Sequence, residues 1–334
     1  MEGGFLNRNV VFFVPEARAP IESLRNMLEP HGEFRDGGNR KWTEDELVRD
    51  AHEWDALLVT SREQITERVI GAATRLRLIA KIGVGVENID IPAATRRKIP
   101  VTNCPGANAV AVAEASLGLM LAASRRIPQG MEKLCKGGWR EGIWIANEMS
   151  GATFGIVGFG NIGRELARLL SGFQGRILAY DAFVDDEAIR SAGVEPVDLG
   201  RLMSESDFIS IHCSLTPETR HMFDAQKFRL MKQSAVLVNC ARGAIIDEAA
   251  LIHALREGEI SSAGIDVFEE EPPKPDNPLF SLPNAVVTPH FAGASHEARE
   301  RVNRLAGENV LAVMRGERVN PKTLLNPEVY EDPS

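Results

Sequence analysis

Short, continuous runs of branched apolar residues recur along the 334-residue chain, separated by segments with helical spacing. Within these runs Val, Ile and Leu follow one another without strict polar alternation, which is typical of strands covered by helices on both faces. The pattern therefore predicts a doubly wound α/β fold built on parallel sheets. The predicted strands are residues 10–15, 56–60, 76–83, 99–103, 154–160, 176–181, 208–213, 235–240, 263–268 and 285–290.

Two long segments with helical spacing divide this pattern into two sheets. Residues 107–126 follow the fourth predicted strand, and residues 295–316 follow the last one. The second segment has an apolar stripe at spacings of three and four, which suits a helix with one buried face. We expect that helix to return to the first sheet. The predicted organisation is a discontinuous domain, residues 1–104 and 290–334, with a second domain, residues 105–289, inserted into it.

Composition and charge exclude several function classes. The formal net charge of −9 argues against a nucleic acid or an anionic membrane as the principal partner. The most apolar long stretch is shorter than the ~20 residues that a bilayer requires, and the N-terminal apolar run is too short for a signal peptide. The four cysteines lie far apart without metal-binding spacing, which predicts reduced thiols in a cytoplasmic protein and no metal site. The final residues, NPEVYEDPS, are expected to fray.

The segment GIVGFGNIG at 155–163 carries the strongest local signal. It follows an apolar strand, opens a helix and precedes a second strand that ends in an aspartate, as in dinucleotide-binding proteins. Glycines there permit a tight turn and close approach of the backbone to a pyrophosphate, whereas the aspartate would accept ribose hydroxyls and repel a 2′-phosphate. NAD is therefore favoured over NADP, and an ordinary turn is the alternative. The predicted cofactor contacts are Gly158, Gly160, Asn161, Ile162, Gly163 and Asp181.

Three residues at the ends of predicted strands suit hydride and proton transfer, and open α/β sheets bind ligands at such ends. Arg242 offers a planar pair of donors for a carboxylate. His290 can pass a proton to a carbonyl oxygen, and Glu271 would orient the imidazole and favour its protonated form. Each residue also has an ordinary interpretation when taken alone: an ion-paired loop arginine, a capping histidine and a solvated glutamate.

Seven segments, read in order, resemble the D-isomer-specific 2-hydroxyacid dehydrogenases over nearly the whole chain. The resemblance implies a Rossmann NAD-binding domain inserted into a flavodoxin-like substrate domain, and a homodimer built largely around the 107–126 region. It also implies hydride transfer between NAD(H) and C2 of a small D-2-hydroxy acid or 2-oxo acid. The segments are KIGVGVENID (81–90), PGANAVAVAE (105–114), GIVGFGNIG (155–163), HCSLTPET (212–219), VNCARGAIIDEAAL (238–251), GIDVFEEEP (264–272) and TPHFAGAS (288–295).

The resemblance also implies roles for individual residues. The catalytic set of the family falls on Arg242, Glu271 and His290, where the arginine binds the substrate carboxylate. Backbone N–H groups of a glycine-containing loop would assist the arginine, and an aspartate would hold the nicotinamide carboxamide. The implied substrate contacts are Ser61, Val84 and Gly85, and the implied cofactor contacts are Cys213, Cys240, Ala241 and Asp266.

Within the family the chain most resembles the short form of the phosphoglycerate dehydrogenase branch, with one departure. That branch commonly has Arg-Ser at the end of an early strand for the substrate phosphate, whereas this chain has Thr60-Ser61 followed by Arg62. Losing a charge-assisted contact there would cost about 1.5–3 kcal/mol. Either Arg62 or Lys81 replaces it, or the substrate is unphosphorylated, such as glyoxylate or hydroxypyruvate.

Two other functions are compatible with this fold. Formate dehydrogenase shares the architecture, but that branch carries glutamine at the position of Glu271, and its substrate has no proton to exchange. An NAD-sensing dimeric scaffold, similar to the C-terminal-binding corepressors, keeps the same three residues, and a shared fold does not fix a shared function. The chain shows nothing similar to the extra tails of such scaffolds, which favours the enzyme.

Overall fold

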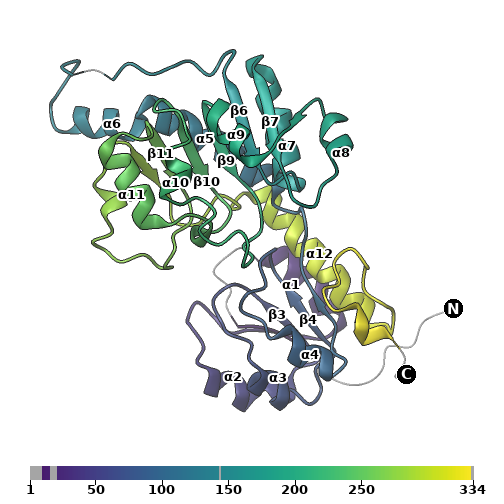
Figure 1. The fold of residues 1–334 in the computed structure, drawn as a ribbon. Coiled ribbons are helices and arrows are strands. Elements are labelled where there is room, and N and C mark those ends of the chain that lie inside the picture. Colours follow the sequence, from purple (N-terminus) through teal and green to yellow (C-terminus); the bar gives the residue numbers. More distant parts are fainter. Residues whose placement is uncertain (1–9, 16–20, 143, 332–334) are drawn as a thin grey trace. The chain divides into compact units, whose positions relative to one another are not determined.

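The computed structural model describes residues 10–15, 21–142 and 144–331, and the chain divides into two compact units. Unit 1 comprises residues 1–108 and 295–334, and unit 2 comprises residues 109–294 (Figure 1). These limits place residues 105–108 in unit 1 and 290–294 in unit 2, a few residues from the predicted boundaries.

Specific contacts explain both shifts in the boundary. Ala107 packs in a core of unit 1, and its carbonyl oxygen accepts a hydrogen bond from Arg301 Nε at 2.7 Å. The backbone N–H groups of Phe291 and Ala292 donate to the carboxylate of Asp266, which lies in unit 2.

Unit 1 is built on a five-stranded parallel sheet of order β2-β1-β3-β4-β5. Each apolar strand sends alternate residues into two cores, so that Leu57 and Val59 of β3 pack in one core and Ala56 and Leu58 in the other. The strands are β1 (Val11–Val14), β2 (Glu33–Asp36), β3 (Ala56–Val59), β4 (Leu78–Lys81) and β5 (Val101–Thr102). The helices are α1 (Glu22–Leu28), η1 (Glu29–His31), α2 (Glu44–Asp50), η2 (Ala51–Glu53), α3 (Glu67–Ala72), α4 (Ile91–Arg96), α12 (His296–Met314) and η6 (Pro327–Tyr330).

Helix α12 begins where the sequence supplies a cap, because the Ser295 side chain accepts a hydrogen bond from the N–H of Ala298. It packs on the sheet of unit 1 through the predicted stripe, of which Val302, Ala306 and Val310 are buried. The expectation that the last residues fray is wrong for Asn326–Tyr330. Asn326 binds the backbone of residues 99 and 101, and Val329 is buried.

Unit 2 is built on a seven-stranded parallel sheet of order β12-β11-β10-β9-β6-β7-β8. The first strand of this unit, β6, lies between β7 and β9, so the order reverses beside it, as in dinucleotide-binding folds. The strands are β6 (Thr153–Val157), β7 (Arg176–Tyr180), β8 (Glu195–Pro196), β9 (Phe208–Ile211), β10 (Val236–Asn239), β11 (Ser262–Ile265) and β12 (Ala285–Val287). The helices are α5 (Ala109–Arg125), α6 (Ile127–Cys135), α7 (Asn161–Leu170), η3 (Ser171–Phe173), α8 (Asp186–Arg190), α9 (Leu199–Glu205), α10 (Ala225–Phe228), η4 (Gly243–Ile245), α11 (Glu248–Glu257) and η5 (Pro278–Phe280).

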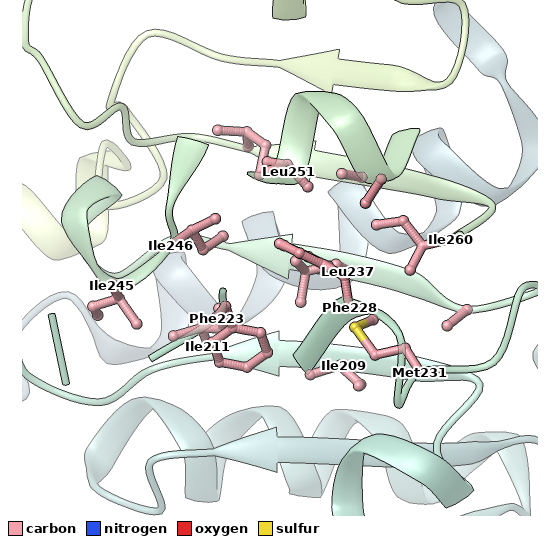
Figure 2. Close-up of a cluster of buried hydrophobic side chains, with 14 of the residues drawn as sticks. Ile209, Ile211, Phe223, Phe228, Met231, Leu237, Ile245, Ile246, Leu251 and Ile260 are labelled. Carbon is pink, nitrogen blue, oxygen red and sulfur yellow. The ribbon is translucent and has the colours of Figure 1, made fainter. Parts of the chain in front are cut away.

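Helices cover both faces of this sheet, which is why its strands read as continuous apolar runs. Helices α5 and α7 pack with Val236 and Val238 of β10 on one face, whereas α9, α10 and α11 pack with Leu237 on the other. Figure 2 shows the second of these cores, where Phe223 and Ile246 lie beside Ile211 and Leu237. The prediction of a doubly wound parallel fold is confirmed.

Two short strands, β2 and β8, were not predicted. Both lie at sheet edges, so each pairs with one neighbour only. Their residues, EFRD and EP, are mostly not buried, so these strands lack the apolar run that marks the others. None of the helices formed by the described residues is long and apolar enough to cross a membrane.

Candidate active site

The glycine-rich turn lies between β6 and α7, beside the point where the strand order reverses. Gly158 has φ +96°, and a Cβ there would lie 2.4 Å from the backbone nitrogen of Cys213, so only glycine fits. Gly163 is equally constrained, because a Cβ would lie 2.2 Å from the carbonyl oxygen of Gly158. A Cβ on Gly160, by contrast, would meet no atom within 4 Å. Gly158 and Gly163 thus pack against neighbouring backbone, whereas Gly160 faces open space. This arrangement suits a phosphate group lying against the backbone of the turn.

Helix α7 begins at this turn with Gly160 as its N-cap and without a side-chain cap in the described chain. The N–H groups of its first turn, which includes Asn161 and Ile162, carry the positive end of the helix dipole. The same residues therefore offer backbone donors to an anion, as a pyrophosphate site requires.

Asp181 follows β7, and its carboxylate is held by the backbone on both sides. Oδ2 accepts a hydrogen bond from the N–H of Phe159 at 2.7 Å. Oδ1 accepts from the N–H groups of Phe183 at 2.8 Å and Val184 at 3.1 Å. The sequence did not indicate these three donors. They fix the carboxylate directly beside the glycine-rich turn, which is the position that a ribose-binding group needs.

The predicted cofactor contacts Cys213, Cys240 and Ala241 follow β9 and β10. Burial raises the pKa of Cys213 to about 11 and that of Cys240 to about 12. Both thiols are therefore protonated at neutral pH, which excludes thiolate chemistry there. Burial also lowers the pKa of the neighbouring His212 to about 3, so this imidazole stays neutral.

Asp266 lies at the end of β11 and is 1% exposed. Its Oδ1 accepts hydrogen bonds from Thr288 Oγ1 at 2.6 Å and from the N–H of Phe291 at 3.0 Å, and its Oδ2 accepts from the N–H of Ala292 at 2.9 Å. The carbonyl oxygen of Asp266 also accepts from the N–H of His290 at 2.8 Å. Asp266 thus holds the segment that carries His290, a role that sequence reasoning missed.

The central feature of the site is a hydrogen bond of 2.7 Å between His290 Nδ1 and Glu271 Oε2. His290 follows β12 and Glu271 follows β11, so adjacent parallel strands bring the two side chains together. The other oxygen of the carboxylate, Oε1, accepts from the N–H of Phe268 at 3.0 Å. His290 has φ +51°, a left-handed conformation that is uncommon for a residue with a side chain and often marks a functional position.

Electrostatics shifts the pKa of each partner in the direction that favours an ion pair. The hydrogen bond that His290 donates to Glu271 raises the pKa of His290 most; burial and Arg242 oppose this, while the charges of Glu271 and Asp266 add to it. Burial raises the pKa of Glu271, but the hydrogen bonds from His290 and Phe268 outweigh burial and leave it below its ordinary value. Arg242 lowers both values, so its charge acts on both members of the pair.

Arg242 lies between β10 and η4. Its Nη1 donates to the carbonyl oxygen of Ala241 at 2.8 Å, and Asn239 Nδ2 donates to the carbonyl oxygen of Arg242 at 3.0 Å. The guanidinium is therefore anchored beside the ends of β10 and β11. A cavity of about 310 Å³ adjoins the acid–base pair and is lined by Glu271 and His290 together with Phe268, Phe280 and Val287.

The predicted substrate contacts Ser61, Val84 and Gly85 lie in unit 1, and their roles stay a prediction. Thr60 and Ser61 follow β3, and Lys81 ends β4. Lys81 is 4% exposed, and its ammonium donates to the carbonyl oxygen of Thr60 at 2.6 Å and to Asn88 Oδ1 at 2.7 Å. The ammonium is thus bound inside unit 1.

Two further residues of unit 2, which the sequence did not single out, form a second histidine–glutamate contact. His221 Nε2 lies 2.6 Å from Glu269 Oε1. Both residues fall in or beside segments of the family resemblance, but no spacing rule indicates that the two segments meet. Among the described residues, no group of three His, Cys, Asp or Glu side chains lies close enough together to hold a metal ion.

The chain is similar in sequence to known dehydrogenases and reductases. Residues 117–292 match the family model of the D-isomer specific 2-hydroxyacid dehydrogenase, NAD binding domain. The D-3-phosphoglycerate dehydrogenase of Methanocaldococcus jannaschii is 44% identical over 276 residues, which cover 82% of this chain and 52% of that protein. The glyoxylate reductase of Pyrococcus furiosus is 42% identical over 322 residues, which cover 94% of this chain and 95% of that protein.

A solved structure shows the same fold. The D-lactate dehydrogenase of Aquifex aeolicus, crystallised with NAD and lactic acid, matches with a TM-score of 0.82 and 26% identity over 97% of this chain and 100% of that one. The chain spans about half the length of the phosphoglycerate dehydrogenases that it matches. The predicted resemblance and the NAD-binding fold are confirmed, and the chain belongs to the D-isomer specific 2-hydroxyacid dehydrogenase family.

Proposed function

We propose that this protein is an NAD-dependent dehydrogenase that interconverts a small 2-oxo acid and the corresponding D-2-hydroxy acid. The observation that carries the proposal is the His290–Glu271 hydrogen bond of 2.7 Å, which lies at the strand ends beside Arg242. A histidine next to a fixed guanidinium can protonate a carbonyl oxygen of a substrate whose carboxylate binds the guanidinium.

The proposed cofactor contacts use the glycine-rich turn and the residues around it. The open front of the turn at Gly160 receives the pyrophosphate, and Asp181 receives the ribose hydroxyls. Cys213, Cys240, Ala241 and Asp266 complete the proposed set. NAD, when bound, supplies or accepts the hydride.

His290 moves the proton in this proposal. Its Nδ1 faces Glu271, so Nε2 is the nitrogen left to donate to the substrate oxygen during reduction and to accept the proton in the reverse direction. Glu271 fixes the ring and stabilises the imidazolium, which is why the pKa of His290 lies above its ordinary value. Arg242 binds the substrate carboxylate, because its planar pair of donors matches two carboxylate oxygens.

We propose an unphosphorylated substrate of the glyoxylate or hydroxypyruvate class, with the phosphorylated hydroxypyruvate as the alternative. Residue 60, where the phosphoglycerate branch commonly has arginine, is threonine here. Lys81 is buried, and its ammonium donates to Thr60 and Asn88, so a phosphate would have to compete with these two hydrogen bonds. Breaking the hydrogen bonds of a buried ammonium is costly, which favours a neutral substrate tail.

We also propose that the protein is a homodimer in the cytoplasm. Helix α6 directly follows α5, and its apolar residues Ile127, Met131 and Leu134 are 57–68% exposed on one helical face. Apolar groups gathered in this way favour a partner surface, and continuity with the 107–126 region favours a second copy. The four cysteines are free thiols, which suits a reducing compartment.

The first prediction tests the activity itself. Glyoxylate, hydroxypyruvate, phosphohydroxypyruvate and pyruvate are each mixed with NADH and protein, and the near-ultraviolet absorbance of NADH is followed. We expect oxidation with glyoxylate or hydroxypyruvate, a lower kcat/KM for phosphohydroxypyruvate, and slower reactions with NADPH because Asp181 repels the 2′-phosphate. No oxidation with any acid would contradict the enzyme and support the NAD-sensing scaffold. A preference for the phosphorylated acid that is lost in Arg62→Gln would restore the phosphoglycerate alternative.

A further inference from the structure

The contact between His221 and Glu269 joins two loops that are distant in the sequence. His221 lies in the loop after β9, and Glu269 lies in the loop after β11, two residues before Glu271. The two side chains meet at 2.6 Å, a short charge-assisted contact. Both are partly exposed, at 41% and 35%. A surface pair of this kind adds little stability, so its geometry matters more than its strength.

The loop after β10, which carries Arg242, lies between these two loops. On one side, the backbone N–H of His221 donates to the carbonyl oxygen of Ala244 at 2.8 Å, and Phe223 pairs with Ile245 in the same way. Figure 2 shows Phe223 packed beside Ile245 and Ile246. Backbone hydrogen bonds and apolar packing therefore hold the His221 loop against the Arg242 loop.

On the other side, the Glu269 segment lies directly against the residue that follows Arg242. A Cβ on Gly243 would lie 1.9 Å from the carbonyl carbon of Phe268 and 2.4 Å from the nitrogen of Glu269. Backbone therefore touches backbone here, with no space between them. The contact between His221 and Glu269 spans this junction, so one bridge fastens all three loops.

Two further polar groups of Glu269 also form hydrogen bonds. Its backbone N–H donates to Glu248 Oε2 at 3.1 Å, and its Oε2 accepts from the N–H of Glu248 at 3.4 Å. Glu248 begins α11, and its other oxygen accepts from Asn277 Nδ2 at 2.7 Å. The glutamate that meets His221 is thus held on the framework of the sheet and α11.

Glu269, which is held by Glu248, is separated from Glu271 of the acid–base pair by one residue. Phe268, whose backbone lies against Gly243, donates its N–H to Glu271 Oε1 at 3.0 Å. A movement of residues 268–269 would therefore move both the donor to Oε1 and the start of the turn that presents Oε2 to His290. The position of Glu271 depends on the place where residue 269 is held.

We propose that His221 and Glu269 form a positioning clamp that holds Glu271 in register with His290 and keeps both aligned with the Arg242 loop. Neither residue touches the reacting atoms. The kinetic part of this inference rests on the proposed function, but the structural part does not. Misplacing a catalytic group by about 1 Å can cost up to ~10²-fold in rate, so a clamp made of one weak surface pair can matter for activity.

The second prediction tests the clamp without using activity. His221→Asn keeps a residue type that tolerates the φ of +51° at this position, but its shorter side chain cannot reach Glu269. Glu269→Gln keeps size and shape and removes the charge. His253→Asn, at an exposed position of α11, is the matched control. The chain has seven histidines, so NMR titration of protein labelled at the histidine ring, assigned with His290→Asn, reports the pKa of His290 directly.

We expect the pKa of His290 to shift downward in His221→Asn and in Glu269→Gln, and to stay unchanged in His253→Asn. The charged groups acting on His290 are Glu271, Asp266 and Arg242, and the clamp variants leave all three in place. A shift therefore reports a change in position of Glu271. The double variant should equal the larger single effect, because one contact is lost only once. A pKa of His290 unchanged in both variants would overturn the clamp, whatever the enzyme does.

Kinetics supplies the second measurement. We expect about a tenfold lower kcat for the 2-oxo acid in His221→Asn, with an unchanged KM for NADH, and recovery in His221→Gln, whose amide can still donate to Glu269. A loss in His253→Asn of the same size, or a purely thermal defect with normal kcat at low temperature, would reduce the pair to a structural contact and contradict the proposal. An inactive wild-type protein with the expected pKa shifts would refute the proposed function and leave the clamp standing.

Discussion

Unit 2 contains two histidine–glutamate pairs that share one contact and differ in their surroundings. In both pairs an imidazole nitrogen lies 2.6–2.7 Å from a carboxylate oxygen, and both histidines have φ +51°. The charges of Asp266 and Arg242 act on His290, and the His290 pair lines a cavity of about 310 Å³. The carboxylate of the His221 pair is engaged instead with the start of α11. The same hydrogen bond therefore suits proton transfer in one place and the positioning of loops in the other.

The comparison is tested most strongly by making the same substitution in each pair. We expect His290→Asn to lower kcat by about 10²–10⁴-fold, the range that general acid–base catalysis contributes, because asparagine keeps the backbone conformation but supplies no proton. His221→Asn should cost about tenfold. Stopped-flow measurement of NADH oxidation gives kcat, and the binding of NADH, followed by its fluorescence, serves as the control for folding. Equal losses in the two variants would remove the distinction between the pairs.

A smaller effect is expected from the two carboxylates. Glu271→Gln removes the hydrogen-bonded charge that does most to raise the pKa of His290, so that pKa falls. In the proposed mechanism reduction requires protonated His290, so activity should decline as the pH rises through its pKa. The alkaline limb of kcat/KM should therefore move to lower pH, with a loss of about tenfold near neutral pH. Glu269→Gln should move the limb in the same direction by less. A limb that stays in place in Glu271→Gln would contradict the assignment of His290 as the acid.

The sequence predicted the parts of this site that depend on one strand and its following loop. Gly158 and Gly163 lie in a turn that rejects any Cβ, and Glu271 and His290 lie together because adjacent parallel strands end at the same edge of the sheet. Ten strands were found because their residues form apolar runs that are mostly buried. The edge strands β2 and β8 were missed because their polar residues lack that pattern.

What sequence reasoning missed depends on approaches between loops. Nothing local in the sequence around His221 or around Glu269 indicates that the two side chains meet, because the contact depends on the close approach of the backbone at Gly243. The structural role of Asp266 was missed for a similar reason. The resemblance indicated a cofactor contact, whereas the structure adds three hydrogen bonds to the segment that carries His290. Such roles follow from the packing of three loops rather than from any one of them.

The smallest expected effect concerns stability. The raised pKa of His290 stabilises the folded protein at pH values below the ordinary value of about 6.5, and this contribution is lost as the pH rises through the raised value. The lowered pKa of Glu271 contributes above its ordinary value of about 4.5 and is lost as the pH falls through the lowered value. Both contributions are present together only between about pH 4.5 and 6.5. Because His290 is half exposed, the charge pair should contribute no more than about 1 kcal/mol.

Thermal unfolding of wild type and Glu271→Gln between pH 4 and 8 checks this window. The glutamine oxygen can still accept from the N–H of Phe268, but a neutral acceptor binds it more weakly across this pH range, so only the part of the difference that varies with pH reports the ion pair. The pH-dependent part of the Tm difference should be greatest near pH 5–6, where it should not exceed about 2–4 °C for a unit of this size. It should become smaller toward pH 8. A difference that grows toward pH 8 would mean that Glu271 stabilises the fold by a contact other than protonated His290, and the two pairs would then be alike.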